Sequence, residues 1–254
     1  MSDVVAVEEP LERRLVYWFK DAPAVQSLGF TMRTPGHDRE LMIGSLLAED
    51  VIRSRSDLIE VRHLGAPPSN EILAEVAKHV DVEGWRLGRA SYVNSSCGVC
   101  GKRTLDGIVR PFQHASQPGM TVDSRVLSML PDRLLQFQDA FSKTGGLHAA
   151  ALASASGDIL QVFEDVGRHN ALDKLLGWCV LKDCVPLDNN IVFLSSRSSF
   201  ELVQKVVVAG GQMIVTVGAP SSLAIETARA YGITLVGFVR GQRFNVYAGE
   251  WRIN

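Results

Sequence analysis

IVFLSSRSSFELVQKVVVAGGQMIVTVG, residues 191–218, joins two unbroken apolar runs through a segment of helical composition. We predict strands over Asn190–Ser195 and Met213–Gly218, with a helix over Phe200–Ala209 between them. Strands without polar alternation are buried on both faces, which occurs where helices cover both sides of a sheet. The stretch therefore indicates a strand–helix–strand unit of an α/β domain.

The same alternation continues on both sides of this stretch. The further predicted elements are strands over Leu147–Ser154, Ile159–Phe163 and Thr234–Val239, a turn at Ser156–Asp158, and helices from about Gly167 to Leu176 and over Ser222–Tyr231. Upstream, apolar residues from Leu127 to Phe141 recur in steps of three and four, which predicts one face of a helix. We predict that Pro131 interrupts this helix and lies in the first turn of the part that follows. The second half is therefore predicted to be a three-layer α/β domain.

The first half contains shorter predicted elements. They are strands over Leu11–Phe19, Leu28–Thr34, Ser56–Leu64 and Trp85–Val93, and a helix from Glu40 to Leu47 that Asp38 caps. Residues Gly107–Gly119 contain prolines and glycines without a periodic pattern, so we predict a linker there. We expect a smaller mixed α+β domain over residues 1–118 and the α/β domain over residues 119–254.

The charge balance excludes a strong field around the whole molecule. The chain has 254 residues, with 26 basic and 28 acidic side chains and a formal net charge of −2, so we expect no binding to nucleic acid or to an anionic membrane. The N-terminus lacks the pattern of a secretory signal, and glycines and a proline interrupt the longest uncharged stretch, Val206–Ile225. Four cysteines do not indicate a disulfide scaffold in a chain of this length. We expect a cytoplasmic protein.

Two loops at predicted strand ends are rich in small polar residues, Ser195–Ser199 and Gly218–Ser222. Ligands of such sheets bind beyond the carboxyl ends of parallel strands, where helix starts present unpaired N–H groups. Both loops are candidates for phosphate binding, the first with Arg197 alongside. The alternative is that these serines only cap helices.

The segment GFVRGQRFNVY, residues 237–247, follows the last predicted strand and reaches the same edge of the sheet. Arginine side chains suit phosphate, and aromatic faces suit a stacked base. The residues concerned are Phe238, Arg240, Gly241, Arg243 and Phe244. The alternative is a solvated turn with ordinary surface charges.

The segment EDVGRHNALDK, residues 164–174, is dense in polar groups. Arg168 could grip a ligand, and His169 could act as a general acid or base. The alternative is a histidine that only supports the structure.

The segment SSCGVCGK, residues 95–102, places Cys97 and Cys100 in a CxxC pair. A zinc site would need two further ligands, and the C-x4-C spacing of Cys179 and Cys184 is atypical. A zinc deaminase would show H-x-E and a proline before the pair, and this chain has neither. A thioredoxin-type oxidoreductase would have the pair at a helix start in a compact βαβ unit, whereas here it precedes the α/β repeats.

Sulfur transfer is a third chemistry for this pair. The neighbouring Lys102 and Arg103 favour the thiolate form of a cysteine. A thiolate can take the outer sulfur from a persulfide, and Cys100 could then displace it from Cys97 as sulfide. Glycines at positions 98 and 101 would let the loop reach two partners.

Several long strings in the chain together resemble the FdhD/NarQ family, the formate dehydrogenase accessory sulfurtransferases. They are TPGHDREL…GSLLAEDVI near residues 34–52, SSCGVCGK, TGGLHAAAL at 144–152, EDVGRHNALDKLLG at 164–177, SSRSSFELVQK at 195–205 and GFVRGQRFNVY. These strings span most of the chain and are far more specific than a CxxC pair alone. Two departures fall in the first-domain helix, where the resemblance leads us to expect a bulky residue at Ser45 and glycine at Asp50.

The resemblance implies a sulfurtransferase that takes sulfur from a cysteine desulfurase. It implies delivery to the molybdenum cofactor, bis-(molybdopterin guanine dinucleotide), before this cofactor enters the formate dehydrogenase apoenzyme. It further implies a homodimer, a cytidine deaminase-like fold without zinc ligands in the larger domain, and a guanine nucleotide as a mimic of the cofactor. Cys97 would carry the persulfide, with Cys100 as its partner. The implied cofactor-binding residues are Phe238, Val239, Arg240, Gly241, Gln242 and Arg243, with Arg197 and Ser198 as phosphate contacts.

Two other functions remain open at this point. A non-catalytic chaperone could hold the cofactor and use the CxxC pair as a zinc clip or redox lock. A disulfide oxidoreductase is the third possibility.

Overall fold

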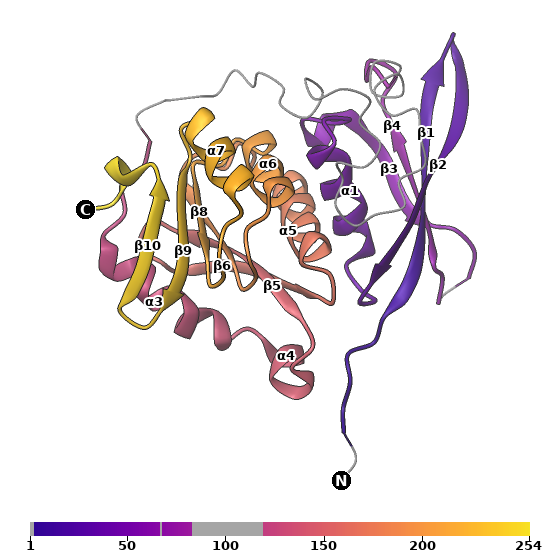
Figure 1. Ribbon diagram of the computed structural model, residues 1–254. Helices are drawn as coiled ribbons and strands as arrows, with labels where there is room; N and C mark the ends of the chain where they lie inside the picture. Colours follow the sequence, from indigo (N-terminus) through magenta and orange to yellow (C-terminus); the bar gives the residue numbers. More distant parts are fainter. Residues whose placement is uncertain (1–2, 67, 83–118) are drawn as a thin grey trace.

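The computed structural model describes residues 3–66, 68–82 and 119–254, which form two β-sheets and their covering helices (Figure 1). The predicted strand Trp85–Val93 and nearly all of the predicted linker lie outside these residues, so the domain boundary at 118/119 stays a prediction. No helix among the described residues is long and apolar enough to cross a bilayer.

The first sheet has four strands in the order β2-β1-β4-β3. Strands β1 (Glu9–Phe19) and β2 (Ala22–Arg33) form an antiparallel hairpin, β4 (Glu71–Val76) pairs parallel with β1, and β3 (Leu58–His63) pairs antiparallel with β4. The predicted strand at Ser56–Leu64 starts later, because Arg55–Asp57 form a 3-10 turn. Strand β4 was not predicted, although its buried residues Ile72, Ala74 and Val76 occupy every second position, as a half-buried strand requires.

The helix α1 (Asp38–Ala48) covers this sheet, and its start differs from the prediction. The N-cap residue is His37, which has a left-handed φ of 56°, and Asp38 is the first helical residue. The Asp38 carboxylate does not cap the helix, because it accepts hydrogen bonds from the Arg33 guanidinium at 2.9 and 3.0 Å instead. At the other end Asp50 has a φ of 58°, a conformation that favours glycine and agrees with the residue expected there.

The second sheet has six strands in the order β10-β9-β8-β7-β5-β6. Their bounds are His148–Ser154 for β5, Ile159–Asp165 for β6, Asn190–Leu194 for β7, Met213–Thr216 for β8, Thr234–Arg240 for β9 and Arg243–Ala248 for β10. The strands β7, β8 and β9 are parallel, and β5 pairs antiparallel with both β6 and β7. The strands β6 to β9 therefore all run in one direction, and β5 and β10 run against them.

Helices cover both faces of this sheet, so the predicted three-layer α/β architecture is confirmed (Figure 1). One face carries α5 (Arg168–Leu181), α6 (Phe200–Val208) and α7 (Ser222–Ala230). The other carries α3 (Ser124–Leu135), which α4 (Asp139–Thr144) follows. The side chains of β7 point alternately to the two faces of the sheet. Val192 and Leu194 belong to the core cluster on the α5 side, and Ile191 and Phe193 belong to the cluster on the α3 side.

The prediction for Pro131 was wrong. Pro131 lies inside α3, whose apolar face at Leu127, Leu130 and Leu134 is fully buried against the sheet. Packing of this face keeps the helix continuous past the proline, and the chain leaves the helix only after Leu135.

Helices α1 and α5 cross at two glycines that bring their backbones into contact. A Cβ atom on Gly44 would lie 1.8 Å from the Asp173 carbonyl oxygen, and one on Gly177 would lie 1.9 Å from the Glu40 carbonyl oxygen. One continuous apolar cluster therefore runs from the first sheet through α1 to α5 and the second sheet. The crossing joins the two sheets into one packed structure.

We expect Gly44→Ala and Gly177→Ala each to destabilise the protein by about 1–3 kcal/mol or more. Alanine would favour a helix by about 1 kcal/mol, but the helices must separate to admit the methyl group. Chemical denaturation would measure the change. Gly146→Ala is the matched control, since its Cβ would meet its nearest neighbour at 3.6 Å. A Gly177→Ala variant as stable as the wild type would contradict this account of the crossing.

Candidate functional site

Four parallel strands of the second sheet end at one edge, where the predicted loops meet. Ser198 donates its N–H to the Ala219 carbonyl at 3.2 Å, and Ser221 donates its N–H to the Ser198 carbonyl at 3.0 Å. Phe238 donates its N–H to the Gly218 carbonyl at 3.1 Å. The loops after β7 and β8 and the end of β9 therefore lie side by side, as the sequence predicts.

Glycines allow this close approach. A Cβ on Gly218 would lie 2.8 Å from the Arg197 Cγ atom, and one on Gly237 would lie 3.1 Å from the Gly218 carbonyl oxygen. Any side chain at Gly218 would therefore move Arg197, so this glycine sets where the Arg197 side chain starts.

The segment Phe238–Arg243 forms a β-hairpin, because Arg243 begins the unpredicted strand β10. Arg240 and Arg243 face each other across a two-residue turn made by Gly241, with a φ of 54°, and Gln242. All four residues are exposed, and Phe238 is 41% exposed with a φ of 57°. Two guanidiniums and an aromatic ring are thus open to solvent on one hairpin.

Val239 differs from its neighbours on this hairpin. Its side chain is fully buried in the core cluster beneath α3. Of the six residues that the sequence assigns to cofactor binding here, Val239 can offer a ligand only its backbone.

The two serine loops differ in whether a serine side chain caps the helix that follows. Ser221 caps α7, since its hydroxyl accepts the Ala224 N–H at 3.2 Å. Ser199 is the N-cap of α6 and makes no such bond. Among the residues that the structure describes, the hydroxyls of Ser198 and Ser199 have no hydrogen-bond partner, and both are buried. The capping interpretation therefore holds for the second loop and fails for the first.

Two histidines lie at the same edge, His148 at the start of β5 and His169 at the start of α5. His148 opens β5 opposite Asp165, and its pKa is lowered by burial and by the charges of Arg168 and Arg197. The His169 Nε2 atom lies 3.9 Å from Glu201 Oε2 in the first turn of α6. Burial, with the charges of Lys205 and Arg168, lowers the pKa of His169 to about 3. The lowered pKa favours the uncharged imidazole at both residues.

His148 was not among the residues singled out from the sequence. It stands at the head of an apolar strand and has no polar neighbour in the chain that would mark a site. Only the antiparallel pairing of β5 with β6 and β7 places it beside Asp165 and the Ser195–Ser199 loop.

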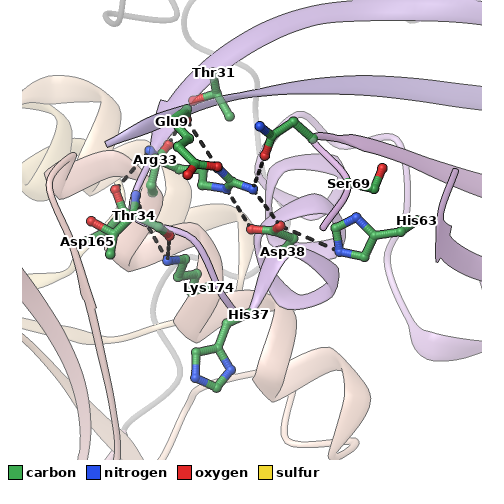
Figure 2. A network of polar contacts seen from close by, with 12 residues as sticks. Glu9, Thr31, Arg33, Thr34, His37, Asp38, His63, Ser69, Asp165 and Lys174 are labelled. Carbon is green, nitrogen blue, oxygen red and sulfur yellow. Dashed lines mark hydrogen bonds and ion pairs between the residues drawn. The ribbon is translucent and has the colours of Figure 1, made fainter. Parts of the chain in front are cut away.

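A buried polar network joins the start of α5 to the loop before α1 (Figure 2). Lys174 Nζ lies 2.7 Å from Asp165 Oδ2 and donates to the Thr34 carbonyl at 2.9 Å. Thr34 donates its N–H to Asp165 Oδ2 at 3.2 Å, and Asn170 Nδ2 donates to the Met32 carbonyl at 2.7 Å. Glu164 accepts the Ala140 and Phe141 N–H groups, and Asp173 pairs with Lys205. Five polar residues of EDVGRHNALDK thus hold the chain's own structure, which leaves Arg168 and His169 at the edge.

The network continues into the first sheet through Arg33 (Figure 2). The buried Arg33 guanidinium binds both carboxylate oxygens of Asp38 and donates to Asn70 Oδ1 at 2.8 Å. His63 Nε2 lies 3.5 Å from Asp38 Oδ2. The motif TPGHD therefore anchors α1 between the sheets.

The thiols in the described part of the chain are Cys179 and Cys184. Cys97 and Cys100 lie outside it. Burial raises the pKa of the Cys179 thiol to about 12, which makes this residue a poor nucleophile. Across residues 3–66, 68–82 and 119–254 no group of three or more His, Cys, Asp and Glu side chains is placed to hold a metal ion.

Comparisons with known proteins agree with one another. A model of the FdhD/NarQ family matches residues 22–254. Relatives named sulfur carrier protein FdhD occur in Mycobacterium tuberculosis, 43% identical over 262 residues, and in Streptomyces coelicolor, 42% identical over 259 residues. These alignments cover 99% of this chain and 92% and 89% of the relatives.

A crystal structure shares the fold. It is that of a protein described as a formate dehydrogenase accessory protein from Desulfotalea psychrophila, with a TM-score of 0.73 and 23% identity. The match covers 100% of this chain and 92% of that chain.

We expect Lys174→Met to lower the free energy of unfolding by about 3–5 kcal/mol, because it leaves the Asp165 carboxylate buried without its cation. Denaturant titration would measure the loss. Lys143→Met changes an exposed lysine on α4 and should be close to the wild type. Replacing both partners, Lys174→Met with Asp165→Asn, should recover part of the loss, and a double variant worse than Lys174→Met would contradict the assigned pairing.

Proposed function

The chain belongs to the FdhD/NarQ family, and from this premise we propose that it carries sulfur on Cys97 from a cysteine desulfurase to a molybdenum cofactor. The observation that supports the proposal is the SSCGVCGK segment in a chain whose relatives are named sulfur carrier proteins. The raised pKa of Cys179 argues against that thiol as the carrier. In this proposal the cofactor is destined for formate dehydrogenase, and the protein acts as a cytoplasmic homodimer.

The transfer uses ordinary thiol chemistry. The Cys97 thiolate attacks the outer sulfur of the desulfurase persulfide, and the donor cysteine leaves as a thiolate. Cys97 then holds the sulfur as its own persulfide. Attack by Cys100 on the inner sulfur releases sulfide to the molybdenum and forms a Cys97–Cys100 disulfide. A dithiol reductant must then restore both thiols before another cycle.

The cofactor is the substrate that receives this sulfur, and we place its guanine dinucleotide end on the β9–β10 hairpin. The exposed Phe238 ring can stack on a base, and Arg240 and Arg243 can bind phosphate. The backbone at Gly241 and Gln242 is open to solvent between them. Arg197 and Ser198, on the neighbouring loop, are proposed as further phosphate contacts.

Incubation with a cysteine desulfurase and cysteine should add one sulfur atom to the wild-type protein, visible as a mass increase of the intact chain. Cys97→Ala should lose this added mass, because the attacking thiolate is gone. Cys184→Ala is the matched control, since that thiol is only half-buried and should not carry the sulfur. Full sulfur loading of Cys97→Ala would overturn the proposed carrier.

The zinc-clip alternative predicts a different result from the same preparation. Tightly bound zinc at about one ion per chain, lost in the Cys97→Ala variant, would favour a structural role for the pair.

The double variant Arg240→Ala, Arg243→Ala should weaken GDP binding by about tenfold or more, since each arginine can give a charge-assisted hydrogen bond to phosphate. Isothermal titration calorimetry would measure the affinity. Sulfur loading on Cys97 should be unchanged. Arg62→Ala, on β3, is the control. Equal GDP affinity in the wild type and the double variant would show that the hairpin does not bind the nucleotide.

A further inference from the structure

A helix covers the first sheet on one face only. The fully buried Leu11, Leu15 and Ile72 point toward α1 and belong to its core cluster. Side chains alternate between the two faces of a strand, so their neighbours along each strand point away from α1. No helix in residues 3–66, 68–82 or 119–254 covers that second face (Figure 1). We call it the open face, and it consists of the side chains of β1 to β4 that point away from α1.

Three large apolar side chains of β2 lie on the open face. Val25 pairs with Val16, and Phe30 pairs with Glu12. Paired residues of an antiparallel ladder point to the same face, and both partners alternate with the buried leucines of β1. Met32 lies two residues beyond Phe30 and points the same way. Val25 is 64% exposed, Phe30 70% and Met32 48%. The open face therefore has two apolar groups, Phe30 with Met32 and Val25 with Val16.

Charged side chains occupy the middle of the open face. Arg14 Nη2 lies 2.9 Å from Glu12 Oε2 and 3.1 Å from Glu71 Oε2. Arg14 pairs with Ser27, and this pair lies between the two apolar groups. The face thus carries both signs of charge at its centre and apolar side chains on each side of it. An exposed apolar area of this kind, with polar groups around it, is typical of an interaction surface.

We propose that the open face is where two copies of this chain meet in the homodimer, an inference that rests on the proposed function for the dimer. A two-fold axis brings one surface against itself, so the surface must be complementary to its own copy. An axis through the Arg14–Ser27 pair places the first apolar group of one protomer on the second group of its partner. The guanidiniums and carboxylates of both copies then balance one another at the centre.

The size of the open face fits such a dimer. Strands β1 and β2 have 11 and 12 residues, and β3 and β4 have 6 each. At about 3.3 Å per residue and about 4.8 Å between strands, they form roughly 550 Å² of sheet. Two copies stacked face to face, as in a β-sandwich, would bury about 1,100 Å², which exceeds the roughly 1,000 Å² that a specific interface needs. A partner recognised mainly by charge would need a face of one sign, whereas this face carries both.

Sedimentation velocity of the full-length protein over a concentration series would measure the dimer dissociation constant. Phe30→Glu and Val25→Glu should each raise this constant by about tenfold or more, because the dimer would bury a carboxylate against apolar side chains. Both side chains are exposed in the protomer, so its fold should tolerate either change. Phe137→Glu is the matched control, because Phe137 is 52% exposed in the second domain, away from the open face.

Thermal unfolding would verify that every variant is folded. A wild type that stays monomeric across the series, or either open-face variant dimerising as tightly as the wild type, would overturn the proposal. If these variants stay dimeric but take up less sulfur from the desulfurase, the open face binds the desulfurase instead, and the proposal fails. Sulfur loading of Cys97 in the wild type judges the proposed function separately, because the added mass does not depend on which surface forms the dimer.

Discussion

The buried ion pair between Lys174 and Asp165 holds the start of α5, which carries Arg168 and His169 of the candidate site. Both side chains are at most 1% exposed, so their charges are removed from water at high cost. Hydrogen bonds to Thr34 and Asn170 offset that cost, and they tie residues 32–34 to the start of α5. Because α5 begins four residues after Glu164, the same contacts determine where Arg168 and His169 lie.

The close approach of the α1 and α5 backbones brings other parts of the chain next to the Lys174–Asp165 ion pair. Gly44 and Gly177 let α1 and α5 touch, which places the loop before α1 within reach of Lys174. Two glycines at the sheet edge, Gly218 and Gly237, let three strand ends pack without intervening side chains. The polar groups at the edge are therefore held by rigid elements, which suits a binding site.

Local patterns predicted most of the second domain correctly. Strands β5 to β9 and helices α5 to α7 follow from unbroken apolar runs and helical spacing, and their predicted positions differ from the observed ones by only a few residues. The loops Ser195–Ser199 and Gly218–Ser222 were placed at one edge because parallel strands end together. Strand β10 was missed because its residues are mostly exposed and show no buried face, and its pairing with β9 decides its conformation.

Other features depend on contacts between residues far apart in the chain. Asp38 was predicted to cap a helix from its neighbours alone, yet Arg33 and Asn70 determine what its carboxylate binds. The polar residues of EDVGRHNALDK could be support or site, and only the approach of Thr34 assigns Asp165 and Lys174 to support. The sequence by itself determined strands β5 to β9, helices α5 to α7, the sheet edge where their loops meet and the CxxC pair, because hydrophobic period and residue type are local properties. The tertiary structure decided which polar groups are paired and which are left without partners, because pairing depends on three-dimensional proximity that no local pattern contains.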